Sequence, residues 1–147
     1  MPAFDTSALL PLFNPQHPHY GRARARFEAA ETVILHPSVI TEFTTVMRRL
    51  AKDKGLDGNE KARQALVALL QQPRVAIRAE MDYDAVVDRY LCAPGISFTD
   101  AVVGASVLHF DKSQPVTFDK KLGKLRAPTA KERARRRKAL ESSLADL

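Results

Sequence analysis

The chain has 147 residues, a formal net charge of +6 and 27% charged side chains. This length suits one domain that buries roughly two-thirds of the surface its unfolded chain exposes, so folding needs neither a disulfide nor a structural metal. Cys92 is the only cysteine, which excludes a disulfide framework and a CxxC zinc site. No apolar stretch approaches the roughly 20 residues of a membrane span, and the first residues lack the basic-then-apolar order of a signal peptide. We therefore expect a cytoplasmic protein that is not bound to a membrane.

Apolar runs and helical repeats alternate along the chain. In chain order, the patterns predict a strand at 2–5, helices at 6–13 and 20–30, a strand at 32–35, helices at 38–50 and 57–70, a strand at 75–77, helices at 82–91 and 100–110, a strand at 114–118 and a helix from 129. This alternation predicts a three-layer α/β/α sandwich around a short, mainly parallel sheet of four to five strands.

Several polar residues stand where the predicted helices begin. We expect Thr6 or Ser7 to cap the first helix and Ser38 to cap the third. Capping residues are also expected at Asp57, at Asp82 and at Thr129, which is followed three residues later by Glu132 as in a capping box.

Four carboxylates lie close to the ends of predicted strands: Asp5, Glu42, Asp100 and Asp119. Ligands of parallel sheets bind outside the carboxyl ends of the strands, so folding is expected to bring these groups into one crevice. N-capping alone would explain each aspartate. It does not explain Glu42, which lies inside its helix, about 60° from the centre of the apolar stripe and therefore at the rim of the buried face.

These residues carry a resemblance to a known family. Asp5-Thr6-Ser7, Glu42, Thr99-Asp100-Ala101 and Thr117-Phe118-Asp119 occur in an order that resembles PIN domains, in particular the VapC-type ribonuclease toxins of prokaryotic toxin–antitoxin pairs. The resemblance covers about residues 3 to 125. It implies a PIN-like nuclease domain at residues 1–126, followed by a basic helical tail at residues 127–147.

The resemblance also implies an activity, a cofactor and partners. PIN nucleases of this kind are metal-dependent endoribonucleases, so Asp5, Glu42, Asp100 and Asp119 would hold Mg²⁺ or Mn²⁺. Oxygen ligands suit these ions. By the same resemblance Ser7, Thr99 and Thr117 would orient the carboxylates, and the protein would act on RNA, form a homodimer and pair with a small antitoxin protein.

Other readings of the sequence remain open at this point. The alternatives are a PIN nuclease of RNA processing without an antitoxin and a non-catalytic RNA-binding PIN-like module. The tail at 129–147 carries six basic and three acidic side chains and suits an RNA clamp, a partner contact or a solvated helix. Arg48, Arg49, Lys120 and Lys121 are candidates for phosphate contacts or for plain solvated surface.

Overall fold

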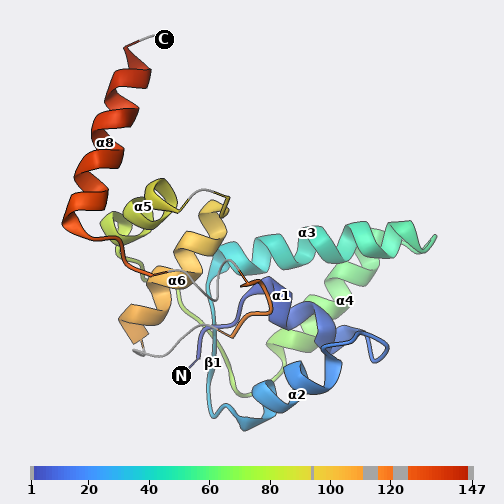
Figure 1. Ribbon diagram of the computed structural model, residues 1–147. Coiled ribbons are helices and arrows are strands. Elements are labelled where there is room, and N and C mark those ends of the chain that lie inside the picture. The colour runs from blue at the N-terminus through green and yellow to red at the C-terminus, as the bar shows by residue number, and fades with distance from the viewer. Residues whose placement is uncertain (1, 94, 111–115, 121–125, 146–147) are drawn as a thin grey trace.

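The computed structural model describes residues 2–93, 95–110, 116–120 and 126–145, without the side chains of 106–110. Short strands and longer helices alternate along these residues (Figure 1). The helical elements are α1 (Thr6–Leu9), η1 (Leu10–Phe13), α2 (Tyr20–Ala29), α3 (Pro37–Asp53), α4 (Gly58–Leu70), α5 (Tyr83–Cys92), α6 (Phe98–Phe110) and α8 (Ala130–Leu144), and the strands are β1 (Val33–Leu35) and β2 (Val75–Ile77).

The sheet is parallel and short. Strands β1 and β2 pair in parallel, with Val33 opposite Val75. Two isolated parallel bridges extend the sheet on the other side of β1, one from Ala3 to Ile34 and one from Phe4 to Val116. Four extended segments therefore lie side by side in the order 116, 3–4, β1, β2, which confirms the predicted parallel α/β fold. The first part of the strand predicted at 114–118 lies outside the described residues.

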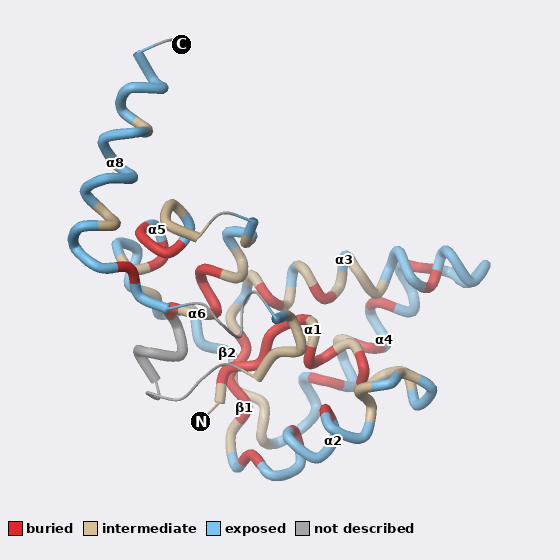
Figure 2. Tube along the Cα trace, in the orientation of Figure 1, coloured by how far each residue is buried: buried red, intermediate tan, exposed pale blue. Residues whose placement is uncertain are grey.

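Helices cover this sheet from both sides. Figure 1 shows α5 and α6 on one side and α1, α2 and α4 on the other. The main core is buried between them (Figure 2) and includes Phe4, Val33, Leu35 and Phe43, each fully buried. Phe4 meets Phe27 of α2 edge-on, with ring centroids 5.8 Å apart. The buried Phe4 thereby fixes the short strand that carries Asp5.

Three of the predicted helix caps are confirmed. The Asp57 carboxylate accepts a hydrogen bond from the Glu60 backbone N–H, and Asp82 accepts one from Ala85. At the start of α8, Thr129 and Glu132 form the expected capping box. These caps are local, within three residues of one another, and so were visible in the sequence.

Two other caps differ from the prediction. Helix α1 is capped by Asp5, whose side chain accepts from the Ser7 N–H, and not by Thr6 or Ser7. Helix α3 is capped by the imidazole of His36, which accepts from the Ser38 N–H. In both cases the capping side chain stands two residues before the polar residue whose N–H it binds. The first correction leaves the Thr6 and Ser7 hydroxyls available for other contacts.

Helices α3 and α4 form a hairpin that extends to one side of the molecule (Figure 1). They approach closely at Gly58, where a Cβ atom would lie 2.6 Å from the Arg48 carbonyl oxygen. At the opposite side α8 extends away from the body of the protein beyond α5. No helix among the described residues is long and apolar enough to cross a membrane.

Candidate active site

Four carboxylates from distant parts of the chain come together at the carboxyl ends of the strands. Asp5 follows the first extended segment and Asp119 follows the bridge residue Val116, while Glu42 lies on α3 and Asp100 in the first turn of α6. Their charges act on one another: Asp5, Asp100 and Asp119 all raise the pKa of Glu42, and Asp5 and Asp119 raise that of Asp100. These effects on the pKa of Glu42 and of Asp100 agree with the prediction that the four carboxylates lie near one another.

Asp5 is almost completely buried, at 3% exposure, and is held by two hydroxyl groups. Its Oδ2 atom accepts hydrogen bonds from Ser7 Oγ at 2.8 Å and from Thr117 Oγ1 at 3.0 Å, in addition to the Ser7 N–H at 3.3 Å. These three donors hold Oδ2 of Asp5 in one position. Within the described part of the chain, Oδ1 of Asp5 receives no hydrogen bond, so this atom is available to a ligand.

Backbone N–H groups set the direction of both hydroxyls. The Phe118 N–H donates to Ser7 Oγ at 2.9 Å, and the Asp119 N–H donates to Thr117 Oγ1 at 3.0 Å. Each N–H occupies one lone pair of its hydroxyl, which leaves the single hydroxyl hydrogen to donate to Asp5 or, across 3.0 Å, to the other hydroxyl. The segment at 117–119 thus orients Asp5 and carries Asp119 at the same time.

Glu42 is half-buried and accepts a hydrogen bond at Oε2 from Thr6 Oγ1, at 3.1 Å. Burial is the main cause that raises its pKa from the usual 4.5; the Thr6 hydrogen bond lowers it, and the neighbouring carboxylates raise it again. The ionised form of Glu42 is thus destabilised where it stands. A cation placed among these carboxylates would reverse that effect.

Asp100 sits in a reciprocal cap at the start of α6. Its Oδ2 accepts from the Ser97 N–H at 3.0 Å, and its own N–H donates to Ser97 Oγ at 3.0 Å. Burial is the largest cause that raises the pKa of Asp100; the Ser97 hydrogen bonds lower it, and the charges of Asp5 and Asp119 raise it. As with Asp5, one carboxylate oxygen is fixed by the protein.

Of the three orienting residues expected from the resemblance, Ser7 and Thr117 contact a carboxylate directly. Thr99 is half-buried beside Asp100, but no hydrogen bond joins it to a carboxylate in the described residues, so its role stays a prediction. Thr6, expected only as a helix cap, and Ser97, for which no role was expected, make such contacts as well. A sequence signal existed for Ser97, because Ser-x-x-Asp is the spacing of a capping box.

An aromatic stack borders the site. The His19 ring lies parallel to the Phe118 ring with centroids 4.5 Å apart, and the Arg22 guanidinium lies 5.3 Å from the same ring. The beginning of α2 thereby packs on the segment at 117–119. No short motif in the sequence indicates this stack, because its two rings are about 100 residues apart along the chain.

The four basic residues considered for phosphate contacts lie in different surroundings. Arg48 lines a surface cavity between α3 and α4 together with Asn59 and Arg63, and Arg49 and Lys120 are exposed. Lys121 lies outside the described residues. A phosphate contact for any of these four stays a prediction.

The carboxylate set suits a divalent cation. In the described residues no three His, Cys, Asp or Glu side chains stand close enough together to hold an ion as they are. The donor chemistry nevertheless fits: all four side chains offer hard oxygen atoms of the kind that Mg²⁺ and Mn²⁺ bind. In addition, the described part of the chain places no Lys or Arg in an ion pair with Asp5, Glu42 or Asp100, and their mutual repulsion is what bound cations relieve.

The fold and this site agree with comparisons to known proteins. The family model for the PIN domain matches residues 3–128, and the chain belongs to the PIN domain family. Among solved structures, it is similar to Mycobacterium tuberculosis VapC20, which is described as a sarcin–ricin loop cleaving toxin, with a TM-score of 0.64, 20% identity, and coverage of 83% of this chain and 92% of that one. No curated protein sequence matches. The resemblance inferred from the sequence is thereby confirmed at the level of family and fold.

The raised pKa of Glu42 predicts a specific dependence of stability on pH. The unfolded chain, in which the pKa of this carboxyl is lower, loses the proton at a lower pH than the folded protein does. The free energy of unfolding therefore falls as pH rises from the unfolded-state pKa to the folded-state pKa. We expect Glu42→Gln to remove part of this fall and to be more stable than the wild type at pH 7 without metal, since Gln can still accept from Thr6. Thermal melts in chelator at a series of pH values measure the effect.

Glu141→Gln is the matched control, because it removes one carboxylate from the exposed surface of α8. Its melting curve is expected to follow the wild type across the same pH range. Parallel curves for Glu42→Gln and the wild type would contradict the prediction.

Proposed function

We propose that this protein is a divalent-metal-dependent endoribonuclease that hydrolyses RNA phosphodiester bonds. The observation that carries the proposal is the group of four carboxylates from four separate elements, whose charges act on one another at the carboxyl edge of the sheet. Such an arrangement lowers the stability of the fold. A fold that does not bind cations would have no reason to retain it. Membership of the PIN family supports the same conclusion.

Asp5, Glu42, Asp100 and Asp119 are the proposed ligands of Mg²⁺ or Mn²⁺. A cation bound there would supply Lewis-acid stabilisation of the phosphate and a water of lowered pKa. The chain's own contribution is orientation. Ser7 and Thr117 hold Oδ2 of Asp5, Thr6 holds Oε2 of Glu42, and Ser97 holds Oδ2 of Asp100. Among the described residues, this leaves the other oxygen of these three carboxylates for the site.

We further infer that the protein is the toxin of a VapBC-type toxin–antitoxin pair. The similarity to VapC20 over most of both chains supports this role. The proposal includes action on RNA in the cytoplasm, a homodimer, and a small antitoxin protein that blocks the carboxylate site. An RNA-processing nuclease without an antitoxin has the same chemistry and differs only in its partner.

Removal of metal tests the catalytic proposal directly. Purified protein incubated with a structured RNA pool is expected to cut RNA with Mg²⁺ or Mn²⁺, to lose this activity in EDTA, and to regain it when excess metal is returned. Because the ligands must be deprotonated, the metal concentration needed should fall as pH rises through the raised pKa values of Glu42 and Asp100. Gel analysis of the RNA gives the measurement.

Two results would oppose the proposal. Cutting that continues in full chelator would exclude a metal-dependent site. RNA binding without cutting under every metal condition would favour the non-catalytic RNA-binding module.

A further inference from the structure

Helix α8 is anchored to the domain along one side. On α5, the carboxylate of Asp88 is only 12% exposed and receives two arginines of α8: Arg137 Nη2 lies 3.0 Å from Oδ1, and Arg133 Nε lies 3.6 Å from Oδ2. Arg136 Nε donates to the Leu91 carbonyl at 2.9 Å. A largely buried carboxylate is costly without a partner, so these contacts fix the side of α8 that faces α5.

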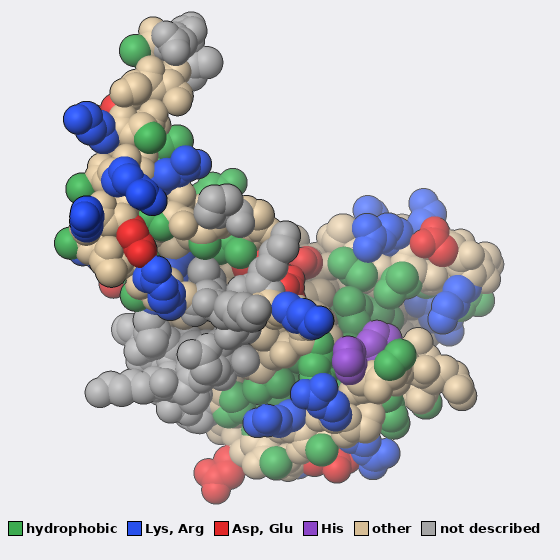
Figure 3. Space-filling view, in the orientation of Figure 1, with side chains coloured by type: hydrophobic (Ala, Val, Ile, Leu, Met, Phe, Trp, Pro, Cys, Tyr) green, Lys and Arg blue, Asp and Glu red, His purple; other side chains and the backbone are tan. Residues whose placement is uncertain are grey.

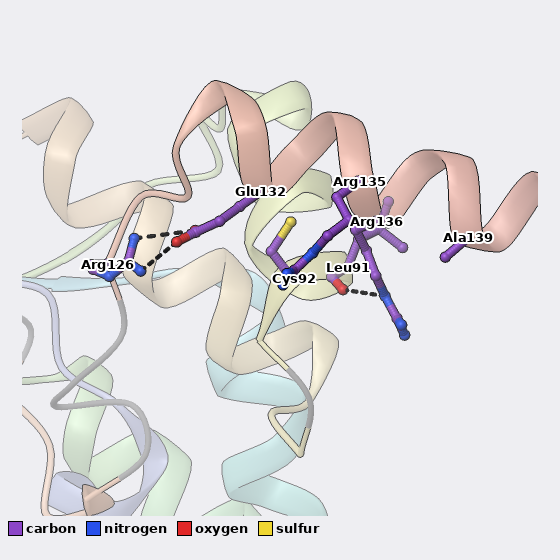
Figure 4. A pocket seen from close by; sticks show the side chains of 7 residues that line it. All are labelled: Leu91, Cys92, Arg126, Glu132, Arg135, Arg136 and Ala139. Carbon is purple, nitrogen blue, oxygen red and sulfur yellow. Dashed lines mark hydrogen bonds and ion pairs between the residues drawn. The ribbon is translucent and has the colours of Figure 1, made fainter.

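The beginning of α8 is fixed as well. Arg126 donates to both carboxylate oxygens of Glu132, at 2.7 and 3.2 Å, and Glu132 also closes the capping box with Thr129. Figure 4 shows these residues along a groove between α5 and α8, with Arg135 and Arg136 on the α8 side. A plain solvated tail would not need this set of contacts, which hold α8 in one direction relative to the domain.

Away from Asp88, α8 carries positive side chains that form no ion pair with another described residue, with Arg135 at the edge of the groove and Lys131 and Lys138 beyond it. Lys131, Arg135 and Lys138 are spaced i, i+4, i+7, which places them within about 60° of one another and about 150° from the side of Arg133 and Arg137. All three are exposed, and none forms an ion pair with another described residue. We call these three residues the outer face of α8.

This outer face has the chemistry of a polyanion site and not of a protein interface. No residue of α8 is buried, as Figure 2 also shows, and the only apolar side chains between residues 130 and 139 are alanines. Protein interfaces are built around an apolar, often aromatic core and are depleted in lysine. Phosphate backbones, in contrast, are bound by exposed Lys and Arg side chains without regard to sequence.

The position of α8 relative to the carboxylates suits a long RNA. Figure 3 shows α8 and the α3–α4 hairpin on opposite sides of the face in view, with Lys and Arg side chains on both and acidic side chains between them. Because the outer face points away from Asp88 on α5, an RNA held there contacts the protein outside the carboxylate site. The positive side chains of α8 and the negative side chains of the carboxylate site thus provide separate places for the RNA backbone and for the cations.

We propose that the outer face of α8 binds the phosphate backbone of RNA outside the region that is cut, and so increases the affinity for long substrates. The proposal rests on the proposed function for the choice of RNA as the polyanion. It assigns α8 a role in affinity and none in the chemical step. The site is independent of sequence, so any specificity would arise elsewhere.

Binding of a labelled RNA by full-length protein tests this inference. The probe is a fluorescein-labelled hairpin of about 30 nucleotides, and anisotropy is measured in EDTA at several KCl concentrations in an Asp100→Asn background, so that the result does not depend on cleavage. We expect Lys131→Gln/Arg135→Gln/Lys138→Gln to weaken binding by about ten- to a hundred-fold at low salt and to reduce the slope of log Kd against log salt by about two to three. Gln keeps the helix propensity of the replaced residues.

Two control proteins separate the site from a general effect of charge. Arg24→Gln/Arg26→Gln/Lys61→Gln removes three exposed charges from α2 and α4 and is expected to change binding much less. Lys131→Arg/Arg135→Lys/Lys138→Arg keeps the charge of the outer face and should bind like the wild type. Circular dichroism confirms that each protein is folded.

Several outcomes would overturn the inference. An unchanged Kd and salt slope in the outer-face variant would do so, as would an equal loss in the α2 and α4 control, or a full loss in the charge-keeping variant. A change of oligomeric state with unchanged RNA affinity would assign the outer face to a second copy of the chain. If binding behaves as expected but the wild type never cuts RNA, the inference stands and the proposed catalysis fails.

Discussion

Asp5→Asn is expected to lower the rate constant for RNA cleavage by about a thousand-fold or more. A bound metal contributes several kcal/mol of transition-state stabilisation, and each 1.36 kcal/mol corresponds to a factor of ten in rate. The amide still accepts hydrogen bonds at one atom, so the cap of α1 and the contacts with Ser7 and Thr117 are retained. What is lost is the negative charge and the second oxygen. Single-turnover cleavage of one RNA at saturating Mg²⁺ gives the comparison.

Asp57→Asn provides the matched control for this variant. Asp57 caps α4 through one hydrogen bond to the Glu60 N–H at 3.1 Å, so it has the capping role of Asp5 without a place among the carboxylates. Its cleavage rate should remain within a few-fold of the wild type. In cells, expression of the wild type and of Asp57→Asn should arrest growth, and expression of Asp5→Asn should not. Equal rates for the two variants would reduce Asp5 to a helix cap.

Phe4→Ala is expected to cost about 3 to 5 kcal/mol of the free energy of unfolding. Phe4 is fully buried in the main core and meets the edge of Phe27, so truncation removes a large apolar area and leaves a cavity. Urea denaturation followed by circular dichroism measures the loss. Because Phe4 precedes Asp5, cleavage should also fall under conditions where the variant is still folded.

Phe98→Ala is the corresponding control for stability. Phe98 is an aromatic residue at the start of α6, but it is 45% exposed and contacts only the ring of Tyr90 among the aromatic side chains in the described part of the chain. We expect a cost of about 1 kcal/mol or less. Similar losses in the two variants would mean that Phe4 is not a central element of the core.

The sequence was informative where the determinants are local. The caps Asp57, Asp82 and Thr129 were predicted because each acts on a backbone N–H three residues on. The caps of α1 and α3 were misassigned because more than one polar residue near each helix start can cap it. That Asp5 and His36 are the caps depends on the path of the preceding strand. Helix and strand types elsewhere followed from apolar periodicity.

Prediction of the site from the sequence was likewise limited to local determinants and to the order of the strands. The four carboxylates were predicted because each follows a strand or lies on the inner rim of a helix, and parallel topology brings such positions together. The contact between Thr6 and Glu42 joins residues 36 positions apart, and the stack of His19 on Phe118 spans a longer distance still. The Asp88 anchor of α8 lies 45 and 49 residues before its two arginines. Contacts of this length depend on packing that no short motif encodes.

The bridges of the first extended segment also bear on when the protein becomes active during its synthesis. Ala3 pairs with Ile34, Phe4 pairs with Val116, and Asp5 takes one of its hydroxyl donors from Thr117. The first extended segment is synthesised long before residues 116–117, so it stays without this second neighbour until they too have been made. In a shorter nascent chain, the Asp5 carboxylate lacks the hydrogen bond from Thr117. A nuclease built on this site would therefore stay inactive until the segment at 116–117 has been made and has paired with the first one.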